Sequence, residues 1–261
     1  MSNNKHKKQP IVIIMAGGLG KRMNSKLPKV LLKINEIPML VNVIKEALQL
    51  NPHKILIVVG KYHEIIHKTI KDYLFEEELT QISFVMQSIP MGTGHAIQCC
   101  APELTKMDDT NPVLVLSGDV PLIQAHLMKM LVSSTFLHGL CIATTIMDDP
   151  NGYGRIVENK SGIEQIIEDK DCTLEQKQIK KINGGIYCFR NDILCEYISQ
   201  LSTNNAQGEF YLTDVIKLIK NGEQRTIGEC LVEKSQQHQI VGVNTPEQLV
   251  ELSHTTSIKR S

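Results

Sequence analysis

Four nearly continuous apolar runs, separated by helical patterns, constrain the fold of this chain most strongly. Strands that are buried on both faces of a parallel sheet carry such uninterrupted β-branched runs, whereas half-exposed strands alternate with polar residues. The alternation of strand and helix predicts an α/β fold with a doubly wound, Rossmann-like sheet that is mixed but mostly parallel. The runs are residues 11–15, 54–60, 82–86 and 113–119. The intervening helices are expected within residues 37–50, 63–77, 93–104 and 123–136.

After residue 139 the pattern changes to shorter strands with glycine and aspartate turns, followed by helices. Neither an internal repeat nor a linker rich in Pro, Gly or Ser separates the two halves. We therefore expect one domain over residues 10–255, in which a second lobe, 139–255, extends the sheet of 10–138 and walls off one side of a cleft. Residues 1–9 and 256–261 are predicted to be tails, the first of them basic and disordered. Strands are expected within 140–149, 152–158, 162–169 and 182–190, and helices within 191–201, 211–220 and 245–254.

The composition argues against several classes of function. Lys plus Arg equals Asp plus Glu at 28 residues each, whereas nucleic-acid binding usually requires a basic excess. No apolar stretch approaches the length of a membrane span, and the polar start MSNNKHKKQ lacks the apolar core of a secretion signal. The seven scattered cysteines include no C-x-x-C motif, which indicates reduced thiols and a cytoplasmic protein.

A glycine-rich segment, AGGLGKRM, follows the first apolar run. Gly17, Gly18 and Gly20 let successive backbone N–H groups approach an anion closely. Arg22 follows these glycines, and Lys29 comes seven residues after Arg22. The segment is neither a G-x-G-x-x-G fingerprint nor a P-loop, but two cations beside a glycine nest suit a triphosphate. A glycine-rich turn with solvated basic residues is the alternative.

The segments MAGGLGKRM and LPKVL resemble the signature of sugar-1-phosphate nucleotidylyltransferases. Seven further segments match, in the same order, the uridylyltransferase domain of bacterial N-acetylglucosamine-1-phosphate uridylyltransferases. The resemblance therefore covers nearly all of residues 10–255. The seven segments are QSIPMGTGHAI, VLVLSGDVPLI, DDPNGYGRIVE, IIEDKD, INGGIY, NNAQGEFYLTDVI and VGVN.

The resemblance implies a nucleotidyltransferase-type sheet in which residues 10–138 bind the nucleotide and residues 139–255 bind the sugar. It implies UTP and N-acetylglucosamine 1-phosphate as substrates, Mg²⁺ as cofactor, and UDP-N-acetylglucosamine and pyrophosphate as products. The sugar-phosphate oxygen attacks the α-phosphorus in line, so catalysis consists of positioning and charge stabilisation without a protein nucleophile. The alternatives are another sugar 1-phosphate or nucleoside triphosphate, or a non-catalytic sensor of sugar nucleotides.

Two residues match the metal ligands of the family. Asp119 ends the fourth apolar run, at the carboxyl edge of the predicted sheet, where ligands of such folds bind. Asn244, in VGVN, precedes the last predicted helix. One carboxylate and one amide oxygen would leave Mg²⁺ free to hold phosphate and water oxygens. Taken without the resemblance, each residue also reads as a helix N-cap.

The resemblance assigns the other site residues by position. Lys29 and Arg22 are the predicted catalytic residues, with Lys29 on the transferred phosphoryl group and Arg22 on the departing pyrophosphate. Gln87 is expected to face the uracil edge, Glu168 the sugar hydroxyls and Asn183 the acetamido group. The predicted nucleotide-binding residues are Met15, Ala16, Gly17, Gly18, Gln87, Gly92 and Thr93. The predicted sugar-binding residues are Ser117, Gly118, Gly154, Glu168, Asn183 and Asn244.

Three positions depart from the family pattern. Ser117 replaces a usual tyrosine, Lys21 a usual threonine or serine, and Gly184 a usual threonine. All three lie beside predicted substrate contacts, so the reaction is predicted more firmly than the exact sugar. Residues beyond the predicted domain show no hexapeptide repeat, and we therefore expect neither acetyltransferase activity nor the trimer that such repeats organise. The sequence leaves the oligomeric state open.

Overall fold

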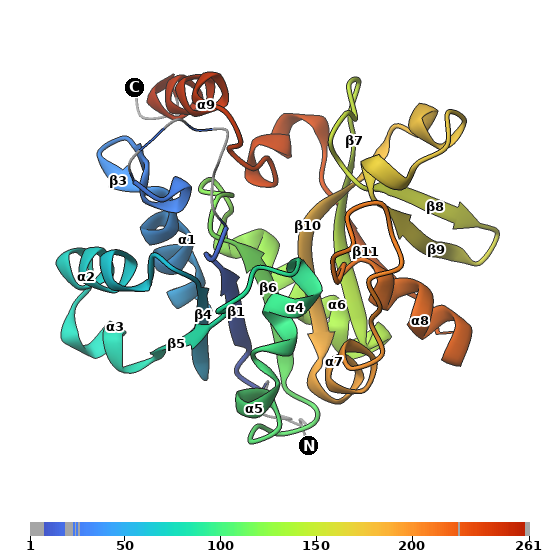
Figure 1. The fold of residues 1–261 in the computed structure, drawn as a ribbon, viewed down its shortest axis with the longest axis horizontal. Helices are drawn as coiled ribbons and strands as arrows, with labels where there is room; N and C mark the ends of the chain where they lie inside the picture. Colours follow the sequence, from blue (N-terminus) through green and yellow to red (C-terminus); the bar gives the residue numbers. More distant parts are fainter. Residues whose placement is uncertain (1–7, 19–22, 24, 26, 224, 259–261) are drawn as a thin grey trace, which may run out of the picture.

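The computed structural model describes residues 8–18, 23, 25, 27–223 and 225–258. The four predicted apolar runs form four adjacent parallel strands of its main sheet, with β5 at the edge (Figure 1). Strand β1 (Ile11–Met15) lies between β4 (Lys54–Val59) and β6 (Pro112–Ser117), and β5 (Ile82–Met86) pairs with β4. All of these pairings are parallel, so the carboxyl ends of the four strands meet at one edge.

The second half of the chain extends the same sheet, as predicted. Strands β7 (Leu140–Ile146), β10 (Lys181–Arg190) and β11 (Gly228–Leu231) complete the order β11-β7-β10-β6-β1-β4-β5. Only β10 runs antiparallel to its neighbours on this path through the described residues, which confirms a mixed but mostly parallel sheet. The hairpin of β8 (Arg155–Asn159) and β9 (Gly162–Ile167) is attached to β10 and lies on the side of the molecule away from β5 (Figure 1).

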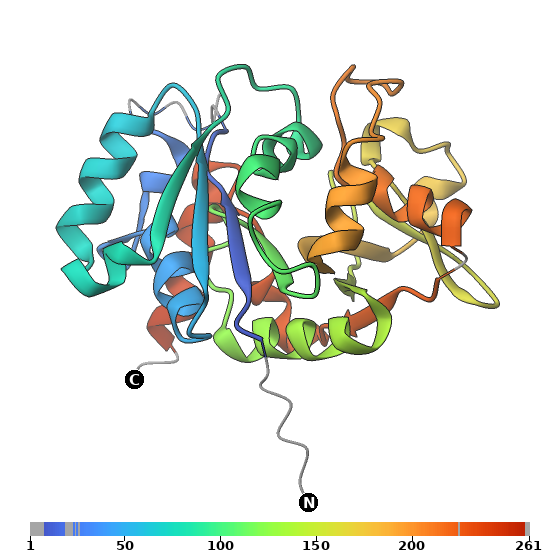
Figure 2. The same ribbon diagram turned by 90° about the horizontal axis from the view of Figure 1, so that it is seen from below.

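Helices cover both faces of the sheet. On one face lie α1 (Met39–Leu48), α2 (His63–Tyr73) and α6 (Ala125–His138), whose apolar side chains share a cluster with Val12 and Ile14 of β1. On the other lie α4 (Thr93–Gln98), α5 (Ala101–Leu104), α7 (Asn191–Ile198) and α8 (Asp214–Glu223), packed in a cluster with Ile11 and Ile13. Figure 2 shows α6 and α7 on opposite sides of the strands. This double burial explains the uninterrupted apolar runs.

Two helices that were predicted as continuous are broken. The predicted helix 63–77 ends at Tyr73, and α3 (Glu76–Thr80) begins after an extended residue, with the Phe75 N–H donating to Glu78 Oε2 at 2.8 Å. The predicted helix 93–104 is divided between α4 and α5, and Pro102 lies in the first turn of α5. Proline lacks an N–H and is compatible with a first turn but not with a helix interior.

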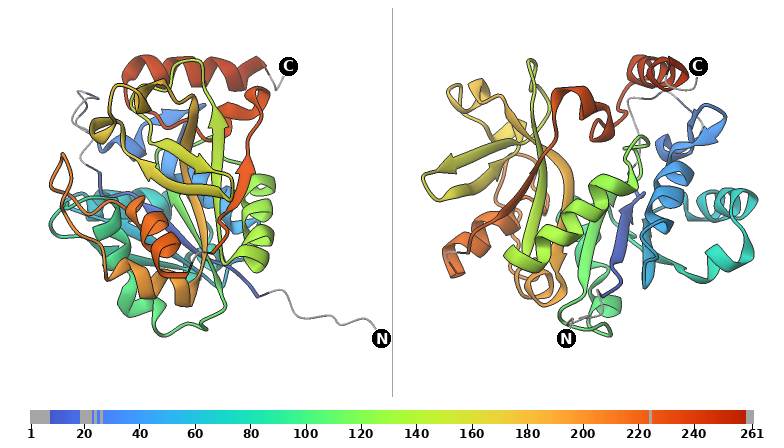
Figure 3. Two further views of the ribbon diagram at one scale, coloured as in Figure 1. Left: turned by 90° about the vertical axis from the view of Figure 1, so that its right-hand side faces the viewer. Right: turned by 180° about the vertical axis from the view of Figure 1, so that it is seen from behind.

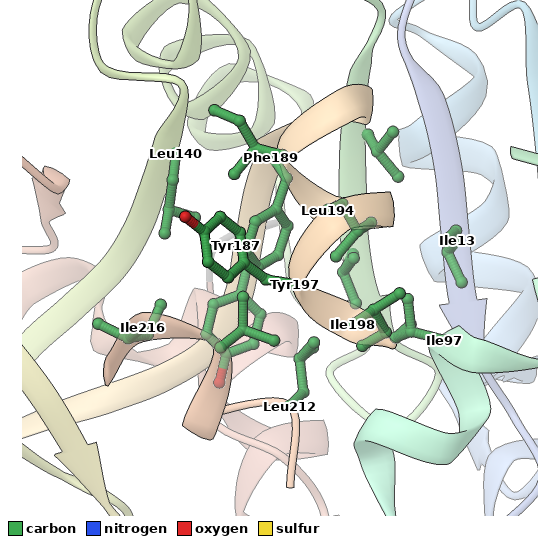
Figure 4. Close-up of a cluster of buried hydrophobic side chains, with 14 of the residues drawn as sticks. Ile13, Ile97, Leu140, Tyr187, Phe189, Leu194, Tyr197, Ile198, Leu212 and Ile216 are labelled. Carbon is green, nitrogen blue, oxygen red and sulfur yellow. The ribbon is translucent and has the colours of Figure 1, made fainter. Parts of the chain in front are cut away.

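Aromatic residues of β10 anchor the apolar cluster that contains Ile11 and Ile13 (Figure 4). Tyr187 and Phe189 stack with ring centroids 5.9 Å apart, and both face Leu194 and Tyr197 of α7. The Tyr187 ring is 3% exposed, so its hydroxyl must find a polar partner inside the protein. That partner belongs to the site described below.

The last helix, α9 (Pro246–Ile258), returns to the first half of the chain. Val243 and Leu252 form a small apolar cluster with Ile34 and Met39. The helix lies beside the hairpin of β2 (Lys33–Ile34) and β3 (Ile37–Pro38), as Figure 3 shows. The helix continues to Ile258, so the predicted tail is wrong for residues 256–258. Short 3-10 helices occur at Lys29–Leu31, Asp169–Asp171, Gln176–Gln178 and Lys234–Gln239.

All seven cysteines carry free thiols, as predicted. Cys99 is half-buried and Cys100 is fully buried, and both pack in the apolar cluster that contains Ile11 and Ile13 rather than forming a redox pair. Within the described ranges of the chain, no helix combines the length and the apolar character needed to cross a membrane.

Candidate active site

Two adjoining cavities lie at the carboxyl ends of the parallel strands. The glycine-loop cavity, of about 260 Å³, is lined among others by Gly17, Gly18, Gln87 and Gly92. The lobe cavity, of about 220 Å³, is lined among others by Tyr153, Gly154, Glu168 and Asn183. The two cavities form one continuous cleft, because they share Met15, Thr93, Ser117 and Asp119.

Gln87 forms the back of the glycine-loop cavity. It follows β5 and is 7% exposed, and its amide Nε2 donates to the Gly92 carbonyl at 3.1 Å and lies 3.2 Å from His95 Nδ1. A Cβ atom on Gly17 would lie 3.2 Å from Gln87 Oε1, tighter than ordinary contact. Glycine at position 17 therefore lets the loop approach Gln87, and the Gln87 carbonyl oxygen is the part of this amide left to meet a ligand.

The loop that carries Gly92 is braced by the distant segment NNAQGEFYLTD. Gly92 has φ +102°, and a Cβ atom there would lie 2.5 Å from the Phe210 carbonyl oxygen. The same carbonyl accepts a hydrogen bond from the Gly94 N–H at 2.7 Å, and the Leu212 N–H donates to the Thr93 hydroxyl oxygen at 3.1 Å. The second half of the chain therefore sets the shape of this nucleotide-side loop.

Four polar side chains meet where the two cavities join. The Lys29 ammonium forms an ion pair with Asp119 Oδ2 and donates to Asn244 Oδ1 at 3.0 Å. The Ser117 hydroxyl donates to Asp119 Oδ1 at 2.6 Å. The Val243 N–H donates to the Asp119 backbone carbonyl at 2.9 Å, which ties the Asn244 segment to the end of β6. The structure thus brings together three of the residues predicted from separate motifs.

The two predicted metal ligands fit a divalent cation. Asp119 and Asn244 direct one carboxylate oxygen and one amide oxygen at the same cation, the Lys29 ammonium. Among the described residues, no group of three or more His, Cys, Asp or Glu side chains could hold a metal. A site with two protein oxygens suits Mg²⁺, which retains water and binds substrate phosphates. His63 and His67, which lie four residues apart on α2, are both exposed.

Replacing Ser117 with alanine is expected to raise the Mg²⁺ concentration needed for half-maximal activity about tenfold. The change removes a hydrogen bond to a charged group, which stabilises by roughly 1.5–3 kcal/mol, and Asp119 Oδ1 then loses its orientation. Ser117→Thr retains the hydroxyl and is the control. A Mg²⁺ titration of the rate measures the effect, and an unchanged midpoint for Ser117→Ala would show that Ser117 does not position Asp119.

Glu168 presents a half-buried carboxylate to the lobe cavity. Its Oε1 accepts a hydrogen bond from the Thr213 hydroxyl at 2.9 Å. Burial raises the pKa of Glu168, and the negative charges of Asp214, Asp171 and Asp169 raise it further. A carboxylate held here can accept hydrogen bonds from a ligand's hydroxyl groups, which would restore some of the solvation lost on burial.

Asn183 also lines the lobe cavity, from an irregular part of β10. Its Nδ2 donates to the Tyr187 hydroxyl at 2.6 Å, and its Oδ1 accepts from the Gly185 N–H at 3.0 Å. The register of β10 against β7 shifts between Asn183 and Tyr187, and Gly185 has φ +70°. Such a bulge changes the direction in which a strand presents its side chains. The Asn183 amide retains one N–H and part of its acceptor capacity for a ligand.

The absence of a side chain at Gly184 has a local reason. A Cβ atom there would lie 3.0 Å from the Ala143 carbonyl oxygen and 3.1 Å from Ile240 Cδ1. A threonine at this position would require Ile240 and the neighbouring strand to move apart. The departure from the family pattern at Gly184 therefore goes together with the isoleucine that packs against it.

Replacing Glu168 with glutamine is expected to stabilise the fold more at pH 8 than at pH 5. Because the folded pKa is raised, the folded state holds a proton that the unfolded state releases above about pH 4.3, so wild-type stability falls as pH rises through the folded pKa. A glutamine side chain does not ionise, so its variant does not lose stability in this way as pH rises. We expect the melting temperature at pH 8 to rise by about 2–4 °C for each kcal/mol relieved.

Thermal melts from pH 4.5 to pH 8 measure this difference. Glu175→Gln is the matched control, because Glu175 is exposed and does not line the lobe cavity. Parallel pH profiles for the Glu168→Gln variant and the wild type would show that the half-buried carboxylate does not oppose folding.

Not every predicted site residue lines the cleft. Arg22, Lys21 and Gly20 lie outside the described residues. Ala16 and Gly118 are buried beneath the cleft, where the Ala16 N–H donates to Val58 and the Gly118 N–H to Met15. The N–H groups of Ala16, after β1, and Gly118, after β6, hold neighbouring strands together, and direct ligand contact by these two residues stays a prediction. The residues placed on the cleft are Met15, Gly17, Gly18, Lys29, Gln87, Gly92, Thr93, Ser117, Asp119, Gly154, Glu168, Asn183 and Asn244.

Sequence reasoning missed two residues that hold the lobe cavity. The Thr213 hydroxyl donates a hydrogen bond to Glu168 Oε1, and the Tyr187 hydroxyl accepts one from Asn183 Nδ2. Thr213 occurs in the segment NNAQGEFYLTDVI and Tyr187 in INGGIY, so both positions fall within segments that match the family. The match did not predict their hydrogen bonds to Glu168 and Asn183. Tyr153 is half-buried and lines the lobe cavity, and burial together with the nearby Asp119 charge raises its pKa.

The chain is similar to known nucleotide-sugar proteins over most of its length. It is 40% identical over 242 residues to a protein named probable UDP-N-acetylglucosamine pyrophosphorylase from Acanthamoeba polyphaga mimivirus, covering 91% of this chain and 92% of that protein. It is 40% identical over 243 residues to the bifunctional protein GlmU of Paraburkholderia phymatum, covering 92% of this chain but 51% of that protein. The chain thus spans about half the length of the bifunctional relatives.

A solved structure has the same fold. The crystal structure of a UDP-glucose pyrophosphorylase complexed with UDP-glucose superposes with a TM-score of 0.74 and covers 96% of this chain and 99% of that chain, at 18% sequence identity. This likeness supports the nucleotidyltransferase-type sheet. The sequence model described as nucleotidyl transferase matches residues 11–232, a stretch that contains the lining residues of the cleft except Ile240, Gly242 and Asn244. The chain therefore belongs to the nucleotidyl transferase family.

Proposed function

We propose that this protein transfers UMP from UTP to N-acetylglucosamine 1-phosphate, forming UDP-N-acetylglucosamine and pyrophosphate. The observation that carries the proposal is the convergence of Lys29, Asp119 and Asn244 at the junction of two cavities, where a nucleotide phosphate and a sugar phosphate would meet. The relatives named as UDP-N-acetylglucosamine pyrophosphorylase and GlmU support this choice of substrates.

The two cavities suggest how the substrates are arranged. UTP would occupy the glycine-loop cavity, with its base near Gln87 and its phosphates directed toward Lys29. The sugar would occupy the lobe cavity, with its hydroxyls on Glu168 and its acetamido group near Asn183. The phosphate oxygen of the sugar then forms a bond to the α-phosphorus of UTP, while the bond from that phosphorus to the β-phosphate oxygen breaks and pyrophosphate leaves.

The side chains at the junction act by charge and position. Lys29 supplies a positive charge beside the transferred phosphoryl group, where negative charge must be stabilised. Ser117 orients Asp119, and the bond from Val243 to the Asp119 carbonyl keeps Asn244 beside it. Asp119 and Asn244 would hold Mg²⁺, which supplies neutralisation of the phosphate charge when bound.

The placement of the lining residues supports a nucleotide-binding half and a sugar-binding half within the predicted domain of residues 10–255. Most described residues of the glycine-loop cavity come from 10–138, and most of those of the lobe cavity come from 139–255. Glu209 is an exception, because it lines the glycine-loop cavity from the second half. The free thiols support a reducing compartment, such as the cytoplasm, as the place of action.

Pyrophosphate release tests the proposal. The protein is incubated with Mg²⁺, each of the four common nucleoside triphosphates and a panel of sugar 1-phosphates, and the nucleotide sugar is identified by mass. UTP with N-acetylglucosamine 1-phosphate should give the highest kcat/KM. Glucose 1-phosphate should be at least about 100-fold poorer, because the buried Asn183 amide would lose its partner.

The panel also separates the alternatives. Faster turnover of another sugar phosphate or nucleotide would reassign the substrate while keeping the chemistry. No turnover with any pair, combined with tight binding of UDP-N-acetylglucosamine, would identify a sensor instead. The retained Lys29, Asp119 and Asn244 cluster favours the enzyme, because binding alone does not require a metal-competent oxygen pair.

A further inference from the structure

Lys29 makes polar contacts with both predicted metal ligands. Its ammonium contacts Asp119 Oδ2 and Asn244 Oδ1, while Ser117 takes the other carboxylate oxygen of Asp119. The Lys29 and Asp119 side chains are only 14% and 16% exposed, so water screens their interaction weakly. A divalent ion bound by the same two oxygens would lie in contact with the Lys29 ammonium, and like charges repel strongly at that distance.

The surroundings of Lys29 offer its ammonium a second position. Lys29 lines the glycine-loop cavity, and its four-carbon side chain can rotate while its backbone stays fixed. The backbone is held by Pro28, which precedes it, and by the Leu32 N–H, which donates to the Lys29 carbonyl at 3.0 Å. A rotation of the side chain alone would therefore move the charge from Asp119 toward the space proposed for the phosphates.

We propose that Lys29 is an exchangeable internal cation that holds the metal site until a nucleotide arrives. In the nucleotide-free protein, its ammonium neutralises Asp119 and opposes divalent-ion binding. Phosphates entering the glycine-loop cavity attract the ammonium, and the two oxygens then become available to the metal. Metal and nucleotide binding are thereby coupled through one side chain. The inference rests on the proposed function for the identity of the phosphate ligand, but its first half does not require it.

Mn²⁺ binding to the nucleotide-free protein tests this proposal. Mn²⁺ prefers the same carboxylate and carbonyl oxygens as Mg²⁺, and its free aquo ion is measured by electron paramagnetic resonance. Lys29→Met should bind Mn²⁺ at least about tenfold more tightly than the wild type, because the competing charge is gone. Lys29→Arg keeps the charge and should remain within about threefold of the wild type. Equal or weaker Mn²⁺ binding by Lys29→Met would overturn the proposal.

Two controls locate the effect. Lys33→Met removes a charge from an exposed position only four residues away and should leave Mn²⁺ affinity unchanged. The double variant Lys29→Met with Asp119→Asn should lose the gain, since the tighter site requires the Asp119 carboxylate. A gain that persists in the double variant would place the ion elsewhere and contradict the proposal. If Lys29→Met melts early, Lys29→Gln gives the same comparison.

The outcomes for this inference and for the proposed function are distinguishable. Suppose that Lys29→Met binds Mn²⁺ more tightly and that the wild-type protein turns over none of the substrate pairs. This result would support the exchange of Lys29 and reject the reaction. Efficient turnover by the wild type, with no gain in Mn²⁺ affinity for Lys29→Met, would support the reaction and reject the exchange.

Discussion

Replacing Asp119 with asparagine is expected to lower kcat for uridylyl transfer by about 10³-fold or more, while the protein remains folded. The substitution keeps the size of the side chain but removes the negative charge that Lys29 contacts and that a metal ion would require. The backbone carbonyl of Asp119 still accepts from Val243, so the Asn244 segment should stay in place. Steady-state rates with UTP and N-acetylglucosamine 1-phosphate measure the loss.

Asp148→Asn is the matched control for this prediction. Asp148 is an exposed carboxylate that pairs with Lys234 on the surface, and losing that pair should change neither kcat nor the melting temperature appreciably. Circular dichroism and thermal melts check that both variants fold. Activity of Asp119→Asn within tenfold of the wild type would show that Asp119 is not the metal-holding carboxylate.

Replacing Gly92 with alanine is expected to destabilise the fold by about 3 kcal/mol or more and to lower kcat/KM for UTP about 100-fold. The new methyl group would lie 2.5 Å from the Phe210 carbonyl oxygen, and the backbone there has φ +102°. Backbone strain of this kind costs about 1–3 kcal/mol by itself. Relief of the clash would separate the 91–94 loop from Phe210 and alter the shape of the glycine-loop cavity.

Gly162→Ala separates strain from crowding. Gly162 has φ +106°, almost the same value, but a Cβ atom there would meet no atom within 4 Å. It lies in the β8–β9 hairpin, so its substitution should cost only the backbone strain and leave the KM for UTP unchanged. Urea denaturation and UTP titrations compare the two variants. Equal losses of stability and no change in KM would remove the proposed role of the Phe210 contact.

Several helices and strands could be predicted from the sequence, because the residue patterns that indicate them lie within short segments. The runs 11–15 and 82–86 became β1 and β5 with unchanged bounds. The central strand β1 is buried on both faces, which requires apolar residues at nearly every position. The edge strand β5 buries only Val85, and its bounds follow from its β-branched and aromatic residues. In contrast, β11 was not predicted. Its four residues, GECL, carry almost no pattern, and they form a strand because β7 provides the pairing edge.

The candidate site was predicted in part. Motifs that match the family placed Lys29, Asp119 and Asn244 in the site individually, and all three reach the cleft. Their contact with one another was not predicted, because Lys29 and Asn244 are 215 residues apart and only packing sets that distance. Gly118 illustrates the opposite case, since its neighbours in the motif line the cleft but its own N–H is used between β6 and β1.

The sequence by itself determined the class of fold, the glycine loop and the kinds of polar groups available for phosphate and metal, because burial periodicity and motif chemistry are properties of short segments. The tertiary structure alone decided that Lys29 shares both metal-ligand oxygens, that Ser117 orients Asp119, and that Phe210 braces Gly92. Those relations join residues that are distant in the chain, and their geometry depends on how the sheet and both helix layers pack together.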